Sequence, residues 1–179
     1  MRQISADLTQ EEVAALVCTT LERHNVDAVL CGGAVVSIYS DNEYESMDLD
    51  FVPLAMFPKV KAAMEELGFR TKGRHWVHPS TSYYVDFSPY PVEVGEEGVV
   101  TDFAERDTTV GRLRLLKPTD CVIDRLAGYY HWSDQQCLDQ AIAVASRHPV
   151  EIERIESWSL KVGKEAEFAE FRDRLQRAR

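Results

Sequence analysis

The sequence predicts a mixed α/β fold, in which a small core with a mixed β-sheet over residues 1–117 is followed by a C-terminal helical subdomain over residues 118–179. In the first part, short apolar and β-branched runs alternate with segments of helical periodicity. After Lys117 and Pro118, the long segments have apolar residues at helical spacing. A chain of 179 residues suits one domain, or a core with a helical extension.

The elements of the first part follow from local signals. Thr9 and Glu12 have the spacing of a capping box, and apolar residues follow them at helical spacing to about residue 24. Further helices are expected over residues 34–39 and 58–67, the second of which is closed by Gly68. Strands are expected over residues 27–31, 47–53, 69–72, 76–78, 83–87, 92–94 and 113–116.

The second part is predicted to be entirely helical. Its helices are expected over residues 120–131, 134–147 and 151–160, with a last one after Gly163. The last helix has three apolar side chains at spacings that direct them inward, Phe168, Phe171 and Leu175. The tryptophans are interpreted as packing residues: Trp76, Trp132 and Trp158.

Two aspartates, Asp48 and Asp50, lie two positions apart on the expected strand 47–53. Side chains with that spacing share one face of a strand, and two carboxylates held together there are unfavourable unless a cation neutralises them. Asp86, on the expected strand 83–87, completes a cluster of three acids if the two strands are neighbours. Mg²⁺ bridging to a phosphate is the usual cation for such a site. The alternative is a pair of surface acids on an edge strand, but the strand around them is mostly apolar.

A glycine pair, Gly32 and Gly33, joins the first expected strand to a helix of small residues. Glycines there allow backbone N–H groups to approach a phosphate at a helix N-terminus. The alternative is a turn that needs a positive φ angle. Ser46, just before the two aspartates, has two open roles: it donates to a phosphate, or it starts the strand.

The glycine pair, the D-x-D sequence and the later strand acid together resemble the nucleotidyltransferase superfamily, which has the DNA polymerase β-like fold. The resemblance implies magnesium-dependent transfer of a nucleoside monophosphate from a nucleoside triphosphate to a hydroxyl acceptor. Asp48 and Asp50 would hold two Mg²⁺ ions, for which Mn²⁺ would substitute. Asp86 would hold the catalytic ion and orient or deprotonate the acceptor. Gly32, Gly33 and Ser46 would bind the nucleotide.

The helical part adds a second resemblance. The sequence from Pro118 to Asp120, Arg125 before a leucine, and the acidic helix that starts at Asp134 are similar to AbiEii/AbiGii-type toxin family nucleotidyltransferases. This resemblance spans about residues 27–147 and implies a bacterial toxin–antitoxin or abortive-infection component with a cognate antitoxin protein. It also implies that Arg125 contacts the phosphates, where the family often has lysine. Asp134 is expected to fix Arg125 or to cap its helix, with capping favoured.

The net charge of −10 argues against extended DNA binding. It leaves an RNA end, a protein side chain or a small molecule open as the acceptor. No apolar run is long enough to span a membrane, and the four cysteines are scattered without a C-x-x-C pair, which favours a reducing cytoplasm. The rival interpretation from another class is a non-catalytic nucleotide-binding or protein-interaction module on the same fold.

His75 lies in a basic stretch with Arg70, Lys72 and Arg74, which is interpreted as a basic rim. His75 and His78 do not have the H-E-x-x-H pattern of a zinc site, and no third ligand is evident. Walker-type phosphate loops are also absent from the sequence.

Overall fold

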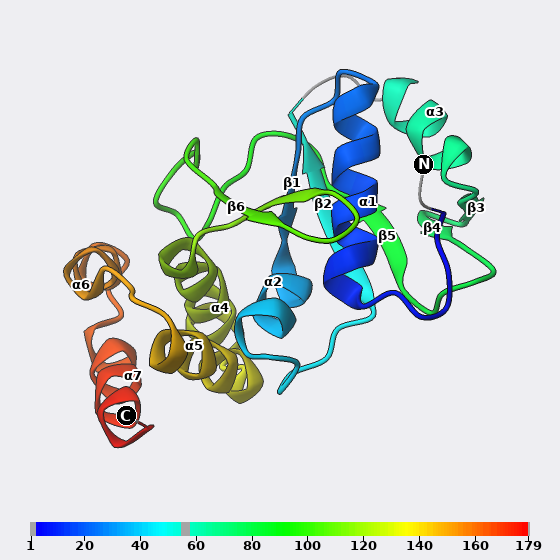
Figure 1. Cartoon of the computed structure of the whole chain (residues 1–179). Helices are drawn as coiled ribbons and strands as arrows, with labels where there is room; N and C mark the ends of the chain where they lie inside the picture. The colour runs from blue at the N-terminus through cyan, green and yellow to red at the C-terminus, as the bar shows by residue number, and fades with distance from the viewer. Residues whose placement is uncertain (1–2, 55–57, 179) are drawn as a thin grey trace.

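The computed structural model describes residues 3–54 and 58–178. In that part of the chain, one mixed sheet has the strand order β3-β4-β5-β2-β1-β7-β6 (Figure 1). The strands are β1 (Ala28–Cys31), β2 (Asp48–Pro53), β3 (Arg70–Lys72), β4 (His75–Val77), β5 (Tyr84–Phe87), β6 (Ala104–Asp107) and β7 (Arg112–Leu115). The helices are α1 (Gln10–Arg23), α2 (Gly32–Tyr39), α3 (Pro58–Glu66), α4 (Pro118–Trp132), α5 (Gln135–Arg147), α6 (Ile152–Lys161) and α7 (Glu165–Ala178).

The predicted fold class is confirmed: a mixed sheet with helices is followed by a helical part. One strand prediction is wrong, and one strand of the sheet was not predicted. The expected strand 92–94 forms only an isolated bridge between Glu93 and Val99. Strand β6 was not predicted, because three of its four residues are charged and show no apolar alternation. It is an edge strand that pairs antiparallel with β7.

Strand β2 lies at the centre of the sheet. It pairs antiparallel with β1 and parallel with β5. Leu49 and Phe51 are fully buried, whereas Asp48 and Asp50 on the opposite face are only partly buried. The alternation therefore packs the apolar residues of β2 into the core and leaves the two carboxylates on the other face.

Helix α1 packs beside α3 and against β1 and β7. The predicted capping box is present, since Thr9 Oγ1 accepts from the Glu12 N–H and the Glu12 carboxylate accepts from the Thr9 N–H. Gln10, the first residue of the helix, is buried, and its Nε2 donates to the Ser46 carbonyl. The start of α1 thus holds the loop that leads into β2.

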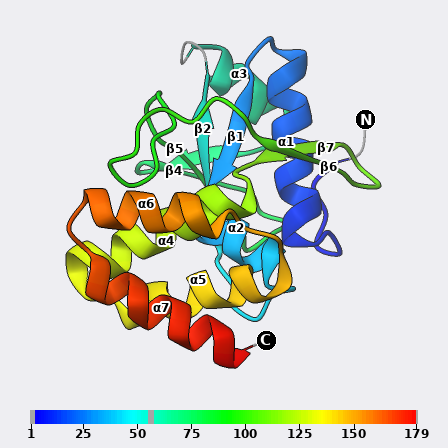
Figure 2. The same ribbon diagram turned by 90° about the vertical axis from the view of Figure 1, so that its left-hand side faces the viewer.

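The helical part packs on the core through α2, which contacts both α4 and α5. Helix α7 contacts α5 and α6 and lies on the side of the helical part away from the sheet (Figure 2). One hydrophobic cluster runs from Phe51 in the sheet to Phe171 in α7. The two parts share this hydrophobic core. The predicted subdomain boundary between residues 117 and 118 therefore stays a prediction. None of the helices in the described ranges is long and apolar enough to cross a membrane.

The predictions for packing residues are mostly confirmed. Phe168, Phe171 and Leu175 are buried, and so are Trp76 and Trp158. The interpretation of Trp132 as a packing residue is wrong, because 78% of it is exposed. Trp132 is the last residue of α4, and Ser133 then turns the chain with a φ angle of 54°. The Trp132 side chain therefore lies at the exposed C-terminal end of α4, outside the hydrophobic core.

Candidate metal and nucleotide site

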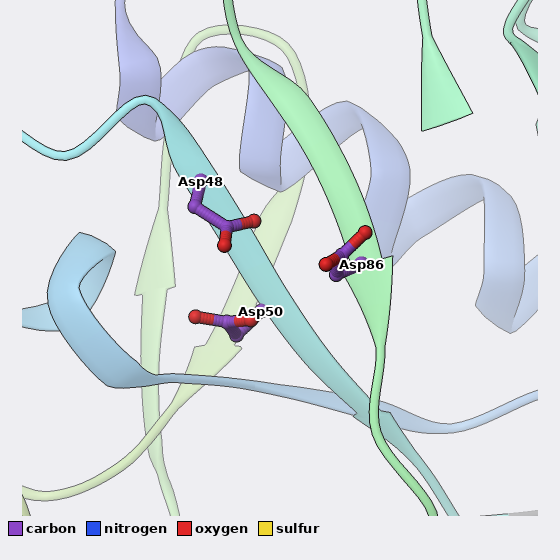
Figure 3. A group of neighbouring side chains, drawn as sticks. All are labelled: Asp48, Asp50 and Asp86. Atoms are coloured by element: carbon purple, nitrogen blue, oxygen red, sulfur yellow. The ribbon is translucent and has the colours of Figure 1, made fainter. Parts of the chain in front are cut away.

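The structure brings Asp48, Asp50 and Asp86 together. One carboxylate oxygen from each lies within 4.8 Å of the others. The parallel register of β2 and β5 places Asp50 directly beside Asp86. Figure 3 shows the three side chains on the same face of the two strands. The spacing of two along β2 and the pairing with β5 together produce the cluster.

Burial and mutual repulsion make this cluster electrostatically strained. Burial, followed by the charges of Asp48 and Asp86, raises the pKa of Asp50 to about 6. Burial and then the charge of Asp86 also raise the pKa of Asp48. In addition, Asp48 Oδ1 is buried without a hydrogen-bond partner among the described residues. Hard oxygen donors, closely spaced and incompletely satisfied, fit a Mg²⁺ or Mn²⁺ ion.

The glycine pair lies directly against this cluster. Gly32 has a φ angle of +68°, and a β-carbon on it would lie 2.6 Å from Asp50 Oδ2. Gly33 has no positive φ, but a β-carbon there would lie 3.2 Å from Ser46 Oγ. The positive-φ explanation therefore applies to Gly32 alone. The N-terminus of α2 has no side-chain cap, so the backbone N–H groups of its first turn are available to an anion beside the carboxylates.

Ser46 connects this glycine turn to β2. Its backbone N–H donates to Ser37 Oγ at 2.9 Å, and Ser37 Oγ donates to the Gly33 carbonyl at 3.2 Å. Ser46 Oγ accepts from the Asp48 N–H at 3.2 Å. Ser46 lies two residues before β2 begins at Asp48, so it precedes the strand and bonds to its first residue. Its contact with a phosphate stays a prediction.

Asp86 has two basic neighbours that sequence reasoning did not assign to the site. His75 Nδ1 lies 2.6 Å from Asp86 Oδ1, and Arg74 Nε lies 3.4 Å from Asp86 Oδ2. Both had been interpreted as parts of a basic rim. The sequence contains no signal for the contact, because it depends on the register between β4 and β5.

Arg125 lies on α4 and is mostly buried, with 20% of its side chain exposed. Its Nε and Nη2 donate to Asp124 Oδ2 at 3.1 and 2.5 Å, and its Nη1 donates to Gln140 Oε1 at 3.5 Å. Its charge also lowers the pKa of Asp50, against the larger effects that raise it. Arg125 is thus held within electrostatic reach of Asp50, while its contact with phosphates stays a prediction.

Asp134 caps α5, as favoured from the sequence. Its Oδ1 accepts from the backbone N–H groups of Gln136 and Cys137 at 2.9 and 3.4 Å. Asp134 and Arg125 both line a hollow of about 450 Å³ beside α4. Other residues that line it include Glu96, Asp124, Gly128, His131 and Trp132.

Similarity to known proteins is found in structure and not in sequence. No model of a known protein family and no curated protein sequence matches this chain. The crystal structure of an antigenic nucleotidyltransferase-like protein from Paracoccidioides brasiliensis matches with a TM-score of 0.58 and 12% identity, over 78% of this chain and 77% of that one. The solution structure of the antibiotic-resistance factor ANT(2'')-Ia matches with a TM-score of 0.45 and 14% identity, over 92% of this chain and 91% of that one.

The first of these matches shows that the chain has the fold of a nucleotidyltransferase-like protein. The superfamily resemblance inferred from the glycine pair and the aspartates is therefore supported at the level of fold. Membership of the AbiEii/AbiGii group is not shown and stays a prediction from the motifs in the helical part.

Proposed function

We propose that this protein is a magnesium-dependent nucleotidyltransferase that moves a nucleoside monophosphate from a nucleoside triphosphate to a hydroxyl acceptor. One observation carries the proposal: Asp48, Asp50 and Asp86 present oxygens within 4.8 Å of one another on one face of the sheet. The shared fold of the nucleotidyltransferase-like protein supports it. The three carboxylates are the residues that would hold Mg²⁺, or Mn²⁺ in its place.

In the proposed reaction, the acceptor oxygen forms a bond to the α-phosphorus of the triphosphate. The bond between the α-phosphorus and the bridging oxygen to the β-phosphate breaks, and pyrophosphate leaves. Asp86 orients the acceptor hydroxyl and takes its proton, which then passes to solvent. Two bound Mg²⁺ ions would supply stabilisation of the negative charge on the attacking and leaving oxygens.

The nucleotide is proposed to lie with its triphosphate against the glycine turn. The first N–H groups of α2, at Gly32 and Gly33, favour an anion there through the positive end of the helix dipole. The close approach of Gly32 to Asp50 Oδ2 places this end of the helix beside the carboxylates. Ser46 and Arg125 are proposed as further phosphate contacts. Arg125 would have to exchange part of its pairing with Asp124 for the ligand.

The acceptor is proposed to be an RNA end, a protein side chain or a small molecule. The resemblance of the helical part to AbiEii/AbiGii-type proteins supports a toxin whose partner is a cognate antitoxin. The rival function is a non-catalytic nucleotide-binding or interaction module on the same fold. The strained, incompletely satisfied acid cluster favours catalysis, since binding alone does not require three converging carboxylates.

The test is to incubate the protein with each α-³²P-labelled nucleoside triphosphate, Mg²⁺ or Mn²⁺, and a cell extract. RNA, protein and small molecules are then separated to find the labelled acceptor. We expect label transfer by the wild-type protein and a loss of at least ~10²-fold in the Asp50→Asn variant, which keeps the size of the side chain but removes its charge. Nucleotide affinity should fall much less. Equal behaviour of wild type and folded Asp50→Asn, in label transfer and in growth inhibition on expression, would leave the interaction module standing.

A further inference from the structure

His75 occupies a defined place beside the acid cluster. Strands β4 and β5 are antiparallel, and Trp76 pairs with Val85, which puts His75 directly across from Asp86. Cross-strand neighbours on one face are close enough to interact directly. The distance of 2.6 Å between His75 Nδ1 and Asp86 Oδ1 shows that they do.

The imidazole ring is itself held in place. Tyr84 lies two residues before Asp86 on β5, so both side chains are on the same face. The Tyr84 ring meets the His75 ring edge-on, with the ring centroids 4.9 Å apart and an interplanar angle of 78°. The ring of His75 therefore has an aromatic neighbour on one side and the Asp86 carboxylate on the other.

The contact has a defined direction. An ionised carboxylate only accepts hydrogen bonds, so the proton between the two groups belongs to His75 Nδ1. This bond occupies Asp86 Oδ1 and leaves Oδ2 facing Arg74. The side chain of Arg74 is 82% exposed, and an exposed ion pair holds its partner only weakly. Oδ2 is thus the oxygen that can turn to an incoming ligand.

We propose that His75 is a positioning residue for Asp86, an inference that rests on the function proposed above. The terminal torsion of an aspartate is broad, so a carboxylate with no fixed partner samples many orientations. The hydrogen bond from Nδ1 selects one of them, in which Oδ1 is held by His75 and Oδ2 is left for a ligand. Residues that orient ligand carboxylates in this way are worth about 10- to 100-fold in metal affinity or activity.

Three variants separate the hydrogen bond from the ring and from the charge. His75→Phe keeps an aromatic ring against Tyr84 but removes the donor. His75→Asn loses the ring but places an amide N–H close to the position of Nδ1. Arg74→Gln removes the exposed cation next to the other Asp86 oxygen. Thermal melts report whether each variant is folded, and His75→Ala replaces His75→Phe if the latter fails to fold.

Two measurements are made on each variant. Calorimetric titration with Mn²⁺ in the absence of nucleotide reports the site directly, and label transfer gives kcat and the KM for nucleotide. We expect His75→Phe to lower Mn²⁺ affinity and kcat by about 10- to 100-fold with little change in KM. His75→Asn should recover most of both losses, and Arg74→Gln should change them less than threefold.

The inference is overturned if His75→Phe matches the wild type in Mn²⁺ affinity and kcat, or if His75→Asn is as impaired as His75→Phe. Should the wild-type protein bind Mn²⁺ but transfer no label, the proposed function fails. The Mn²⁺ affinities of the variants still decide the role of His75 in that case.

Discussion

Gly32 and Asp50 approach each other so closely that a β-carbon on residue 32 would lie 2.6 Å from Asp50 Oδ2. The contact follows from the pairing of β1 with β2, which puts Cys31, the residue before Gly32, opposite Asp50. Gly32 also has a φ angle of +68°, a conformation that glycine adopts with little penalty. A glycine at this position therefore serves the turn and the acid cluster at once.

Gly32→Ala should be damaging for both reasons. The left-handed backbone conformation should cost about 1–2 kcal/mol in the free energy of unfolding. The added methyl group should displace Asp50 and lower Mn²⁺ affinity by roughly 10-fold, by analogy with other disturbances of a ligand carboxylate. Chemical denaturation and calorimetric titration measure the two effects.

Gly73→Ala is the matched control for this variant. Gly73 has a φ angle of +65°, but a β-carbon there would have nothing within 4 Å. It should lose a similar stability and keep its Mn²⁺ affinity. If Gly32→Ala also kept full Mn²⁺ affinity, the glycine would serve only the turn.

The raised pKa of Asp50 predicts how stability depends on pH in metal-free protein. Asp50 has a pKa of about 6 in the folded protein, against an ordinary value of 3.8, so the folded state holds more protons than the unfolded chain between these values. Its contribution to stability therefore falls as pH rises from about 4 to 6. Asp50→Asn should remove this slope and stabilise the metal-free protein above pH 6 by on the order of 1 kcal/mol, after allowance for solvent screening.

Thermal melts from pH 4 to pH 8 with EDTA present would measure this effect. Asp107→Asn is a suitable control, because the Asp107 side chain is 80% exposed and lies in an edge strand. An Asp50→Asn variant that is less stable than wild type at pH 7.5 would mean that the Asp50 carboxylate is stabilised by its surroundings.

A bound divalent ion should neutralise the repulsion among the three carboxylates and stabilise the folded protein. A ligand that binds only the folded state at 100 times its dissociation constant stabilises that state by about 2.7 kcal/mol. We therefore expect Mn²⁺ to raise the melting temperature of the wild-type protein by several degrees and to have no effect on Asp48→Ala. A similar shift in Asp48→Ala would place the bound ion elsewhere.

Much of this site could be predicted from the sequence because its signals are local. The D-x-D spacing alone puts Asp48 and Asp50 on one face of a strand, and the glycine pair marks the start of α2. Asp86 could be proposed because its strand is short, aromatic and β-branched. That β5 is the neighbour of β2 is a property of the whole sheet, which no local pattern specifies.

Most of what was missed depends on strand pairing. The contact of His75 with Asp86 requires the register between β4 and β5. The pairing of Arg125 with Asp124 is local, but it depends on the side-chain rotamers of two adjacent residues, which a sequence pattern does not specify. Strand β6 is held by its ladder with β7 rather than by an apolar pattern of its own, so its charged sequence gave no β signal.

Asp134 provides a test that separates a structural role from a functional one. Its Oδ1 caps α5, so Asp134→Ala should destabilise the protein by about 1 kcal/mol. Asp134→Ser, which keeps a capping oxygen, should restore most of this loss in a denaturation experiment. Nucleotide affinity should be the same in all three proteins. A loss of affinity in Asp134→Ala that serine does not restore would show that Asp134 acts through the hollow it shares with Arg125.

The pairing of Arg125 with Asp124 makes the role of Arg125 testable through its neighbour. Both guanidinium nitrogens that face Asp124 bind the same carboxylate oxygen, Oδ2. Arg125→Lys keeps the charge but loses the planar donor fork that would bind a phosphate at two points, so it should weaken nucleotide affinity by roughly 10-fold. Asp124→Asn keeps Arg125 and weakens the interaction between the guanidinium and residue 124. If Arg125 contacts the triphosphate, Asp124→Asn should bind nucleotide as tightly as wild type or more tightly, because the guanidinium is freer to turn to the ligand.

If Arg125 only stabilises α4, the two variants should lose stability alike and neither should change nucleotide affinity. Calorimetric titration with a non-hydrolysable nucleoside triphosphate, alongside denaturation of each variant, decides between these outcomes.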